Sequence, residues 1–196
     1  VEAIEAIARK HNLKVIYDAA HAFAVRYKGE SLLNYGDLSV LSFHATKIFN
    51  TFEGGAIVCH SKETKQRIDY LKNHGFHDET IIVTAGINAK MNEVQAAMGL
   101  LQLMDIDERI QKLHALANLY RKGLRGIHGV KVLHDLSSVE HNYSYFPVFI
   151  DEETTGFSRD EIYADLQKEN IFTRRYFFPL ISNFPVYRDY SSAKKE

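Results

Sequence analysis

The 196-residue sequence is poor in several residues that mark whole classes of protein. It holds one cysteine, Cys59, three prolines and no tryptophan. A lone cysteine cannot form an internal disulfide, which excludes a disulfide scaffold and favours a reducing, cytoplasmic setting. No apolar run approaches the roughly 18 residues of a membrane span, and we expect no signal peptide in the opening residues.

An excess of charge of either sign is also missing. Lysine and arginine total 24 and aspartate and glutamate total 25, for a formal net charge of -1. A nearly neutral chain has no global electrostatic attraction to nucleic acid or to an anionic membrane, and we expect neither as a partner. The content of 45% hydrophobic and 25% charged residues is instead typical of a globular protein.

Helical and strand patterns alternate along the chain. Apolar spacings of three and four predict helices over residues 1–11, 62–74, 92–124 (interrupted near 105–107) and 158–169. Short apolar runs predict strands over residues 13–17, 38–43, 56–59, 130–133, 145–150 and 171–177. This order indicates an α/β fold that divides near residue 125, into a larger part (1–125) and a smaller α+β part (126–196). Because the helical pattern starts at the first residue, which is not methionine, we expect a piece of a longer protein.

Asp18 ends the first predicted strand, and His21 follows it by three residues. Ligands of α/β proteins gather at the carboxyl ends of parallel strands. A carboxylate there, beside the small Ala19 and Ala20, can bind a protonated pyridine nitrogen by a charge-assisted hydrogen bond, with His21 near a ring substituent. The alternative is that Asp18 caps the following turn and His21 has only local partners.

Lys47 is the only charged residue between residues 38 and 51, with histidine counted as neutral. An unprotonated lysine amine is a nucleophile that forms Schiff bases. Ser42, at the end of a predicted strand, can bind a phosphate, and Gly54 and Gly55 permit a tight turn or a close backbone approach. The alternative is a solvent-exposed lysine in a loop.

Three further groups of polar residues are candidates. Arg174, Arg175 and Tyr176 suit an anionic, ring-bearing ligand such as a nucleotide diphosphate, or belong only to an edge strand. Asn88 is polar and has no evident local role. Two histidines and two acids within residues 74–79 could bind a divalent metal, but a glycine separates the histidines, and we expect no metal site.

Taken together in order, these motifs resemble the DegT/StrS-type sugar aminotransferases, which are fold-type-I pyridoxal-phosphate enzymes. The matching segments are VIYDAAHA (15–22), SFHATK (42–47), EGG (53–55), NHG (73–75), GIN (86–88) and MNE (91–93). They extend over most of the chain, and the ordered set is far more specific than any single motif. The resemblance implies part of a large domain with a mixed, mainly parallel sheet, followed by a small α+β C-terminal domain.

The resemblance also implies roles for individual residues. Lys47 would hold pyridoxal 5'-phosphate covalently and move a proton, and Asp18 would pair with the pyridinium nitrogen. His21 would lie near the ring hydroxyl, and Ser42 would bind the phosphate. Asn88 would reach the phosphate in the neighbouring subunit of a homodimer.

The implied reaction transfers the amino group of glutamate to a keto-sugar on a nucleoside diphosphate, such as a dTDP-3- or 4-keto-6-deoxyhexose, in amino-sugar and lipopolysaccharide synthesis. A pyridoxal-phosphate sugar dehydratase and a non-catalytic regulator of the same fold are alternatives. Lys47 favours transamination, because some dehydratases of the family have histidine there. Phe52 and Lys90 depart from the glycine and arginine common in the family. Family members carry a large segment before the Asp18 strand, so we expect this piece alone to be inactive.

Overall fold

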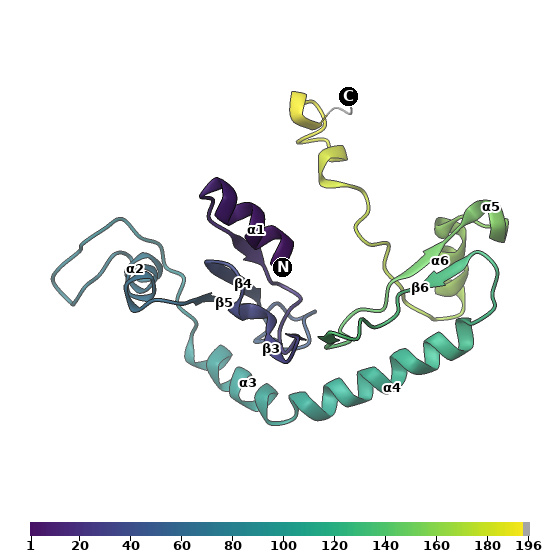
Figure 1. The fold of residues 1–196 in the computed structure, drawn as a ribbon, viewed down its shortest axis with the longest axis horizontal. Helices are drawn as coiled ribbons and strands as arrows, with labels where there is room; N and C mark the ends of the chain where they lie inside the picture. Colours follow the sequence, from purple (N-terminus) through teal and green to yellow (C-terminus); the bar gives the residue numbers. More distant parts are fainter. Residues whose placement is uncertain (194–196) are drawn as a thin grey trace. The chain divides into compact units, whose positions relative to one another are not determined.

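A computed structural model describes residues 1–193 (Figure 1). The helices are α1 (Glu2–His11), α2 (Lys62–Lys72), α3 (Glu93–Met104), α4 (Ile106–Leu124), α5 (Glu152–Thr155) and α6 (Arg159–Lys168), with 3-10 turns η1 (Leu32–Asn34), η2 (Ile181–Asn183) and η3 (Ser191–Ala193). The strands are β1 (Ile16–Asp18), β2 (Arg26–Tyr27), β3 (Glu30–Ser31), β4 (Leu38–Ser42), β5 (Gly55–Cys59), β6 (Val130–Val132), β7 (Val139–Glu140) and β8 (Val148–Ile150). The chain forms two compact units. The first contains residues 1–123 and 134–146, and the second contains residues 124–133 and 147 onward.

The first unit is built around a three-stranded sheet in the order β1-β4-β5. β1 is parallel to β4, with Ile16 opposite Leu38, and β5 is antiparallel to β4, with Ser42 opposite Gly55. The expected α/β class is confirmed, and this sheet is mixed, with one parallel and one antiparallel pair. Antiparallel neighbours can be joined without a crossover. Residues 43–54 are the direct connection between β4 and β5.

Helix α1 leads into this sheet with charges that match its dipole. Glu2 and Glu5 lie in its first turn, and Arg9 and Lys10 lie in its last. Acids near the N-terminus and bases near the C-terminus stabilise a helix. Asn12 then takes a left-handed conformation, which is a common way to end a helix.

A second small sheet joins distant parts of the first unit, in the order β3-β2-β7. β7 is antiparallel to β2, with Val139 opposite Tyr27. This pairing groups residues 134–146 with the first unit, whereas the sequence predicts a single division near residue 125. Two-residue strands carry no periodic pattern, so the sequence contains no signal for this return of the chain.

The long helix expected over residues 92–124 is interrupted as predicted, because α3 ends at Met104 and α4 begins at Ile106. Asn92 caps α3 by accepting a hydrogen bond from the Gln95 backbone at 2.8 Å, while the Gln95 side chain accepts one from the Asn92 backbone at 3.2 Å. Ile106 is buried in the core of the first unit. Within residues 1–193, no helix has the length and apolarity that crossing a membrane requires.

The second unit contains the antiparallel pair β6-β8 and helix α6. α6 begins with the predicted capping box of Ser158 and Glu161. The strand predicted over residues 171–177 is wrong, because this segment is irregular. The Arg175 guanidinium lies 4.7 Å from the ring centroid of Tyr163, on α6. This contact folds the segment back on the helix, and no neighbouring strand pairs with it among the described residues.

Candidate active site

The connection between β4 and β5 is anchored by aromatic packing. Phe43, Ile48 and Phe49 are buried in the core of the first unit. The Phe49 ring stacks on Phe23 with centroids 4.4 Å apart and meets Phe43 edge-on at 4.8 Å. Ile48 and Phe49 directly follow Lys47 in the sequence. Burial of these two neighbours therefore fixes the backbone that carries the half-buried lysine.

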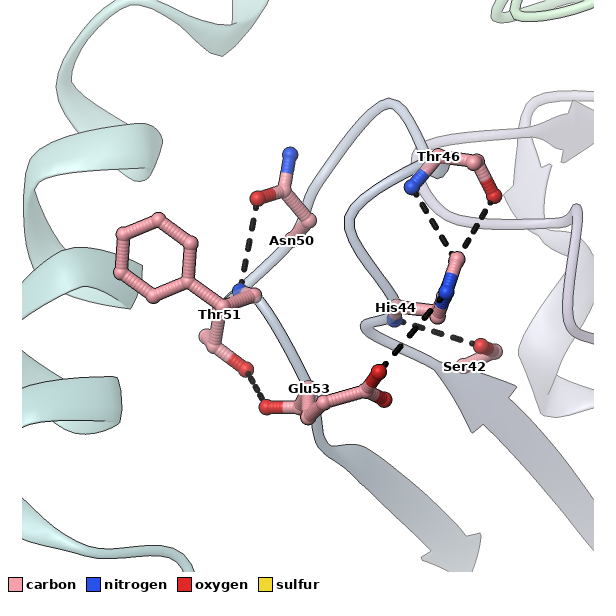
Figure 2. Close-up of polar contacts among 7 residues, drawn as sticks. Ser42, His44, Thr46, Asn50, Thr51 and Glu53 are labelled. Carbon is pink, nitrogen blue, oxygen red and sulfur yellow. Dashed lines mark hydrogen bonds and ion pairs between the residues drawn. The ribbon is translucent and has the colours of Figure 1, made fainter.

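Polar contacts fix the rest of this connection (Figure 2). The Ser42 hydroxyl accepts a hydrogen bond from the His44 backbone at 3.3 Å, and His44 Nδ1 accepts one from the Thr46 backbone at 3.2 Å. His44 Nε2 lies 3.7 Å from a Glu53 carboxylate oxygen. Because a backbone N–H only donates, we assign Nδ1 as the acceptor, which places the proton of the neutral ring on Nε2, facing Glu53.

The two glycines that follow are required by close backbone packing. Thr51 is 1% exposed, and its hydroxyl donates a hydrogen bond to the Glu53 carbonyl at 2.6 Å. A Cβ on Gly54 would lie 2.6 Å from that hydroxyl, and a Cβ on Gly55 would lie 2.6 Å from the Leu41 carbonyl oxygen. Both approaches are too short for a side chain, so glycine at these positions lets the connection close onto β5.

Two of the predicted site residues, Lys47 and Asp18, act on the imidazole of a third, His21. Lys47 Nζ lies 3.0 Å from His21 Nε2. Partial removal from water lowers the pKa of His21, the charge of Lys47 lowers it further, and the carboxylate of Asp18 opposes them. The lowered pKa favours the neutral imidazole, whose Nε2 can accept a hydrogen bond from the amine. One oxygen of Asp18 accepts a hydrogen bond from the Ala20 backbone at 3.1 Å.

The other predicted site residues are placed differently. Ser42 ends β4, at the start of the connection that carries Lys47. Asn88 is exposed and pairs through its backbone with Asn73. Arg174, Arg175 and Tyr176 belong to the second unit. Roles in cofactor or substrate binding stay predictions for all five.

Arg175 and Tyr176 both make contacts within the second unit. The Arg175 guanidinium lies 5.0 Å from the Phe178 ring centroid and 3.5 Å from an Asp160 carboxylate oxygen. The Tyr176 ring stacks on Phe177 at 3.9 Å. Part of the binding capacity of Arg175 is thus used in local packing.

Within residues 74–79, His77 and Asp78 have local partners. His77 Nδ1 is 2.8 Å from the Tyr70 hydroxyl. The Asp78 carboxylate accepts hydrogen bonds from the backbones of Thr80 and Ile81. Among residues 1–193, no group of three or more histidines, cysteines, aspartates or glutamates is placed to hold a metal ion.

Sequence reasoning missed Asn142, which contacts the turn that carries His21. It is 1% exposed, and its side chain donates hydrogen bonds to the carbonyls of His21 and Phe23 at 2.9 and 2.8 Å. A buried polar side chain that reaches across 121 residues of sequence leaves no periodic pattern. The one available signal is an uncharged polar residue within an aromatic stretch, His141 to Phe146.

The chain is similar to known proteins in both its sequence and its structure. The chain is 52% identical over 186 residues to a dTDP-4-amino-4,6-dideoxy-D-glucose transaminase of Shigella dysenteriae, covering 95% of this chain and 50% of that protein. The structure of DesI in the presence of its TDP-sugar product is similar, with a TM-score of 0.89, 38% identity, and coverage of 96% of this chain and 48% of that one.

A further similar structure is the PMP form of Spr1654 from Streptococcus pneumoniae, with a TM-score of 0.81, 26% identity, and coverage of 93% of this chain and 48% of that one. The chain thus spans about half the length of the relatives it matches. Residues 1–196 all lie within the match to a single family. The chain belongs to the DegT/DnrJ/EryC1/StrS aminotransferase family.

Proposed function

We propose that the protein carrying this chain is a pyridoxal-phosphate-dependent aminotransferase that acts on a keto-sugar linked to a nucleotide. The observation that carries the proposal is the distance of 3.0 Å between Lys47 Nζ and His21 Nε2. The charge of the Asp18 carboxylate also acts on this imidazole. A lysine that can form a Schiff base and an acid that can pair with a ring nitrogen are the groups by which proteins typically hold pyridoxal phosphate. Membership in an aminotransferase family supports the same assignment.

The donor set fits pyridoxal phosphate. The Lys47 amine can hold its aldehyde carbon, and the Asp18 carboxylate can pair with its ring nitrogen. The residues beside Asp18, Ala19 and Ala20, have small side chains that a planar ring could approach closely. The Ser42 hydroxyl can donate a hydrogen bond to the phosphate. When bound, the cofactor supplies an electron sink for the carbon that carries the amino group.

The residues of this chain would supply binding, orientation and proton transfer. Asp18 would keep the ring nitrogen protonated through a charge-assisted hydrogen bond. Lys47 Nζ, when free of covalent attachment, would accept and return the proton of the reacting carbon. His21 Nε2 lies within hydrogen-bond distance of that amine and would hold it in place. The anchored backbone on either side of Lys47 would keep these atoms aligned.

The proposed acceptor is dTDP-4-keto-6-deoxy-D-glucose, and the proposed donor is glutamate. The acceptor follows from the name of the Shigella relative, a dTDP-4-amino-4,6-dideoxy-D-glucose transaminase. The proposed assembly is a homodimer, in which the exposed Asn88 would reach the phosphate bound by the second subunit. This arrangement would give an exposed amide a function that its own chain does not supply.

Absorbance spectroscopy of the full-length protein tests the proposal. With pyridoxal phosphate added, we expect a band of lysine-bound cofactor that converts to the pyridoxamine form when glutamate is added. Lys47→Ala should lose both the band and its conversion. Lys112→Ala is the matched control, because this exposed lysine forms its ion pair with the neighbouring Glu108 in α4. A wild-type band that survives Lys47→Ala would contradict the proposal.

The sugar specificity needs a second measurement. Incubation with glutamate and the dTDP-linked 4-keto-sugar should give an amino-sugar that is detected by mass spectrometry. The dTDP-linked 3-keto-sugar should react more slowly. Loss of a hydroxyl group from the sugar without gain of nitrogen would identify a dehydratase instead.

A further inference from the structure

Asn142 uses its whole amide to connect two distant segments. Its Nδ2 donates one hydrogen bond to the His21 carbonyl at 2.9 Å and one to the Phe23 carbonyl at 2.8 Å. Its Oδ1 accepts a hydrogen bond from the Ser144 backbone at 3.2 Å. With 1% exposure, water cannot replace these partners. The asparagine is therefore built to hold the carbonyls of a particular turn.

The turn that it holds carries His21. This part of the chain is irregular, and its internal hydrogen bonds run from the Ala22 backbone to the Ala19 carbonyl and from the Val25 backbone to the Ala22 carbonyl. The His21 and Phe23 carbonyls thus gain from Asn142 the partner that a sheet or helix would otherwise provide.

The segment that contains Asn142 also contacts the His21 ring. The Tyr145 ring centroid lies 4.5 Å from that of His21, at an interplanar angle of 45°. The imidazole also contacts Lys47 Nζ, which lies 3.0 Å from Nε2. Asn142 therefore fixes the backbone of the histidine while Tyr145 limits the rotation of its ring.

A clamp on α4 holds this segment in turn. Arg121 donates to both carboxylate oxygens of Asp135, at 2.6 and 3.0 Å. The Tyr143 hydroxyl donates to Asp135 at 3.0 Å. β7, between Asp135 and Asn142, pairs with β2. The position of Asn142 is thus determined by contacts on both sides of it in the sequence.

We propose that Asn142 and Tyr145 are positioning residues, which set the imidazole of His21 against the amine of Lys47. This inference deepens the proposed function and rests on it for the meaning of the lysine. Neither residue touches the reacting atoms, and both act through His21. Asp18 and Lys47 are charged groups that act on this imidazole.

The first test is an NMR titration of His21 in the cofactor-free, full-length protein. The chain has ten histidines, and His21→Gln identifies the signal in histidine-labelled protein. In the wild type, we expect a pKa below the ordinary histidine value. Asn142→Ser should raise it toward that value, because the turn opens to water and the ring moves away from Lys47. Tyr145→Leu should raise it by a smaller amount.

The matched control is Asn34→Ser, which makes the same substitution at an exposed position. It should leave the His21 titration unchanged. If Asn142→Ser does not fold, Tyr145→Leu decides the question, because its side chain is only half-buried. A folded Asn142→Ser or Tyr145→Leu protein whose His21 titrates as in Asn34→Ser would overturn the inference.

The second test uses the cofactor-loaded enzyme in single turnover with glutamate. Asn142→Ser should slow conversion to the pyridoxamine form at least tenfold, with a smaller change in the glutamate concentration for half-maximal rate. An unchanged rate constant would contradict the inference. A wild-type protein without a cofactor band would overturn the proposed function, while the titration of the cofactor-free protein would still decide the role of Asn142.

Discussion

The two compact units hold their candidate site residues in different ways. In the first, Lys47 is followed by two buried side chains, Ile48 and Phe49. In the second, no described residue of 124–133 or 147–193 is buried, and Arg175 is held by ring contacts at the surface. Burying a phenylalanine contributes about 1.5–3 kcal/mol, and an exposed cation–π contact contributes about 0.5–1 kcal/mol. Burial of its neighbours fixes Lys47 more firmly than surface contacts fix Arg175.

Phe49→Ala should have the largest effect on this comparison. Phe49 is 6% exposed and packs on Phe23 and Phe43, so truncation leaves a cavity beside Lys47. We expect a loss of about 3–5 kcal/mol in the free energy of unfolding. Urea denaturation of the full-length protein, followed by circular dichroism, measures it. The control is Phe172→Ala in the second unit, where the side chain is 81% exposed. Equal losses from the two substitutions would remove the contrast between the units.

Asp135→Asn should have the next largest effect. Asp135 receives two hydrogen bonds from Arg121 and one from Tyr143. We expect the free energy of unfolding to fall by about 1–2 kcal/mol. The effect is moderate because water screens a carboxylate that is 35% exposed. The control is Asp160→Asn in the second unit, where the carboxylate pairs with Arg159 and Arg175 at the surface. A larger loss from the control would show that the surface pairs are the stronger ones.

The same carboxylate predicts a dependence on pH. Removal from water acts to raise the pKa of Asp135, but Arg121 and Tyr143 outweigh it, and the net pKa lies below its ordinary value. Its contribution is therefore complete above about pH 4, near the ordinary value, and is lost as the pH falls through the lower folded value. Urea midpoints between pH 2 and 7 should converge for wild type and Asp135→Asn at the acid end. If the urea midpoints of the two proteins differ by the same amount at every pH, the Asp135–Arg121 pair is not the source of the pH dependence.

Sequence patterns predicted the parts of the fold that rest on local rules. The interruption of the helix near residue 105 and the capping box at Ser158 are confirmed. Both depend on side chains within a few residues of one another. The sequence could predict the grouping of Asp18, His21 and Lys47, because residues at and after the carboxyl ends of neighbouring strands lie close together.

The features that sequence reasoning missed depend on contacts between distant segments. Asn142 reaches His21 across 121 positions, and β7 pairs with β2 through only two residues. The strand over 171–177 was predicted from short runs of apolar residues, but Arg175 within this segment packs on α6 instead. Periodicity reports which residues seek burial or a strand face, and it does not report which partner is within reach.

His44→Ala tests the polar half of the anchoring around Lys47. His44 Nδ1 accepts a hydrogen bond from the Thr46 backbone, one residue before the lysine. Removing it should lower the free energy of unfolding by about 1 kcal/mol. His44→Asn should recover most of that loss, because an amide oxygen can replace Nδ1 as the acceptor. Urea denaturation of both variants measures the difference. Equal stabilities would mean that aromatic packing alone holds this connection.

Phe52→Gly should have the smallest effect, and in the opposite direction. Phe52 has a φ of 65°, in the left-handed region that favours glycine, and its side chain is 55% exposed. Relief of about 1–2 kcal/mol of backbone strain is partly offset by the greater freedom of glycine in the unfolded chain, about 0.5–1 kcal/mol. We expect a net gain of about 0.5 kcal/mol in the urea experiment. Phe52→Ala is the matched control, because it removes the ring and keeps the strained Cβ. Only if glycine is more stable than alanine here does the backbone of the Lys47 connection, rather than the phenylalanine ring, carry the strain.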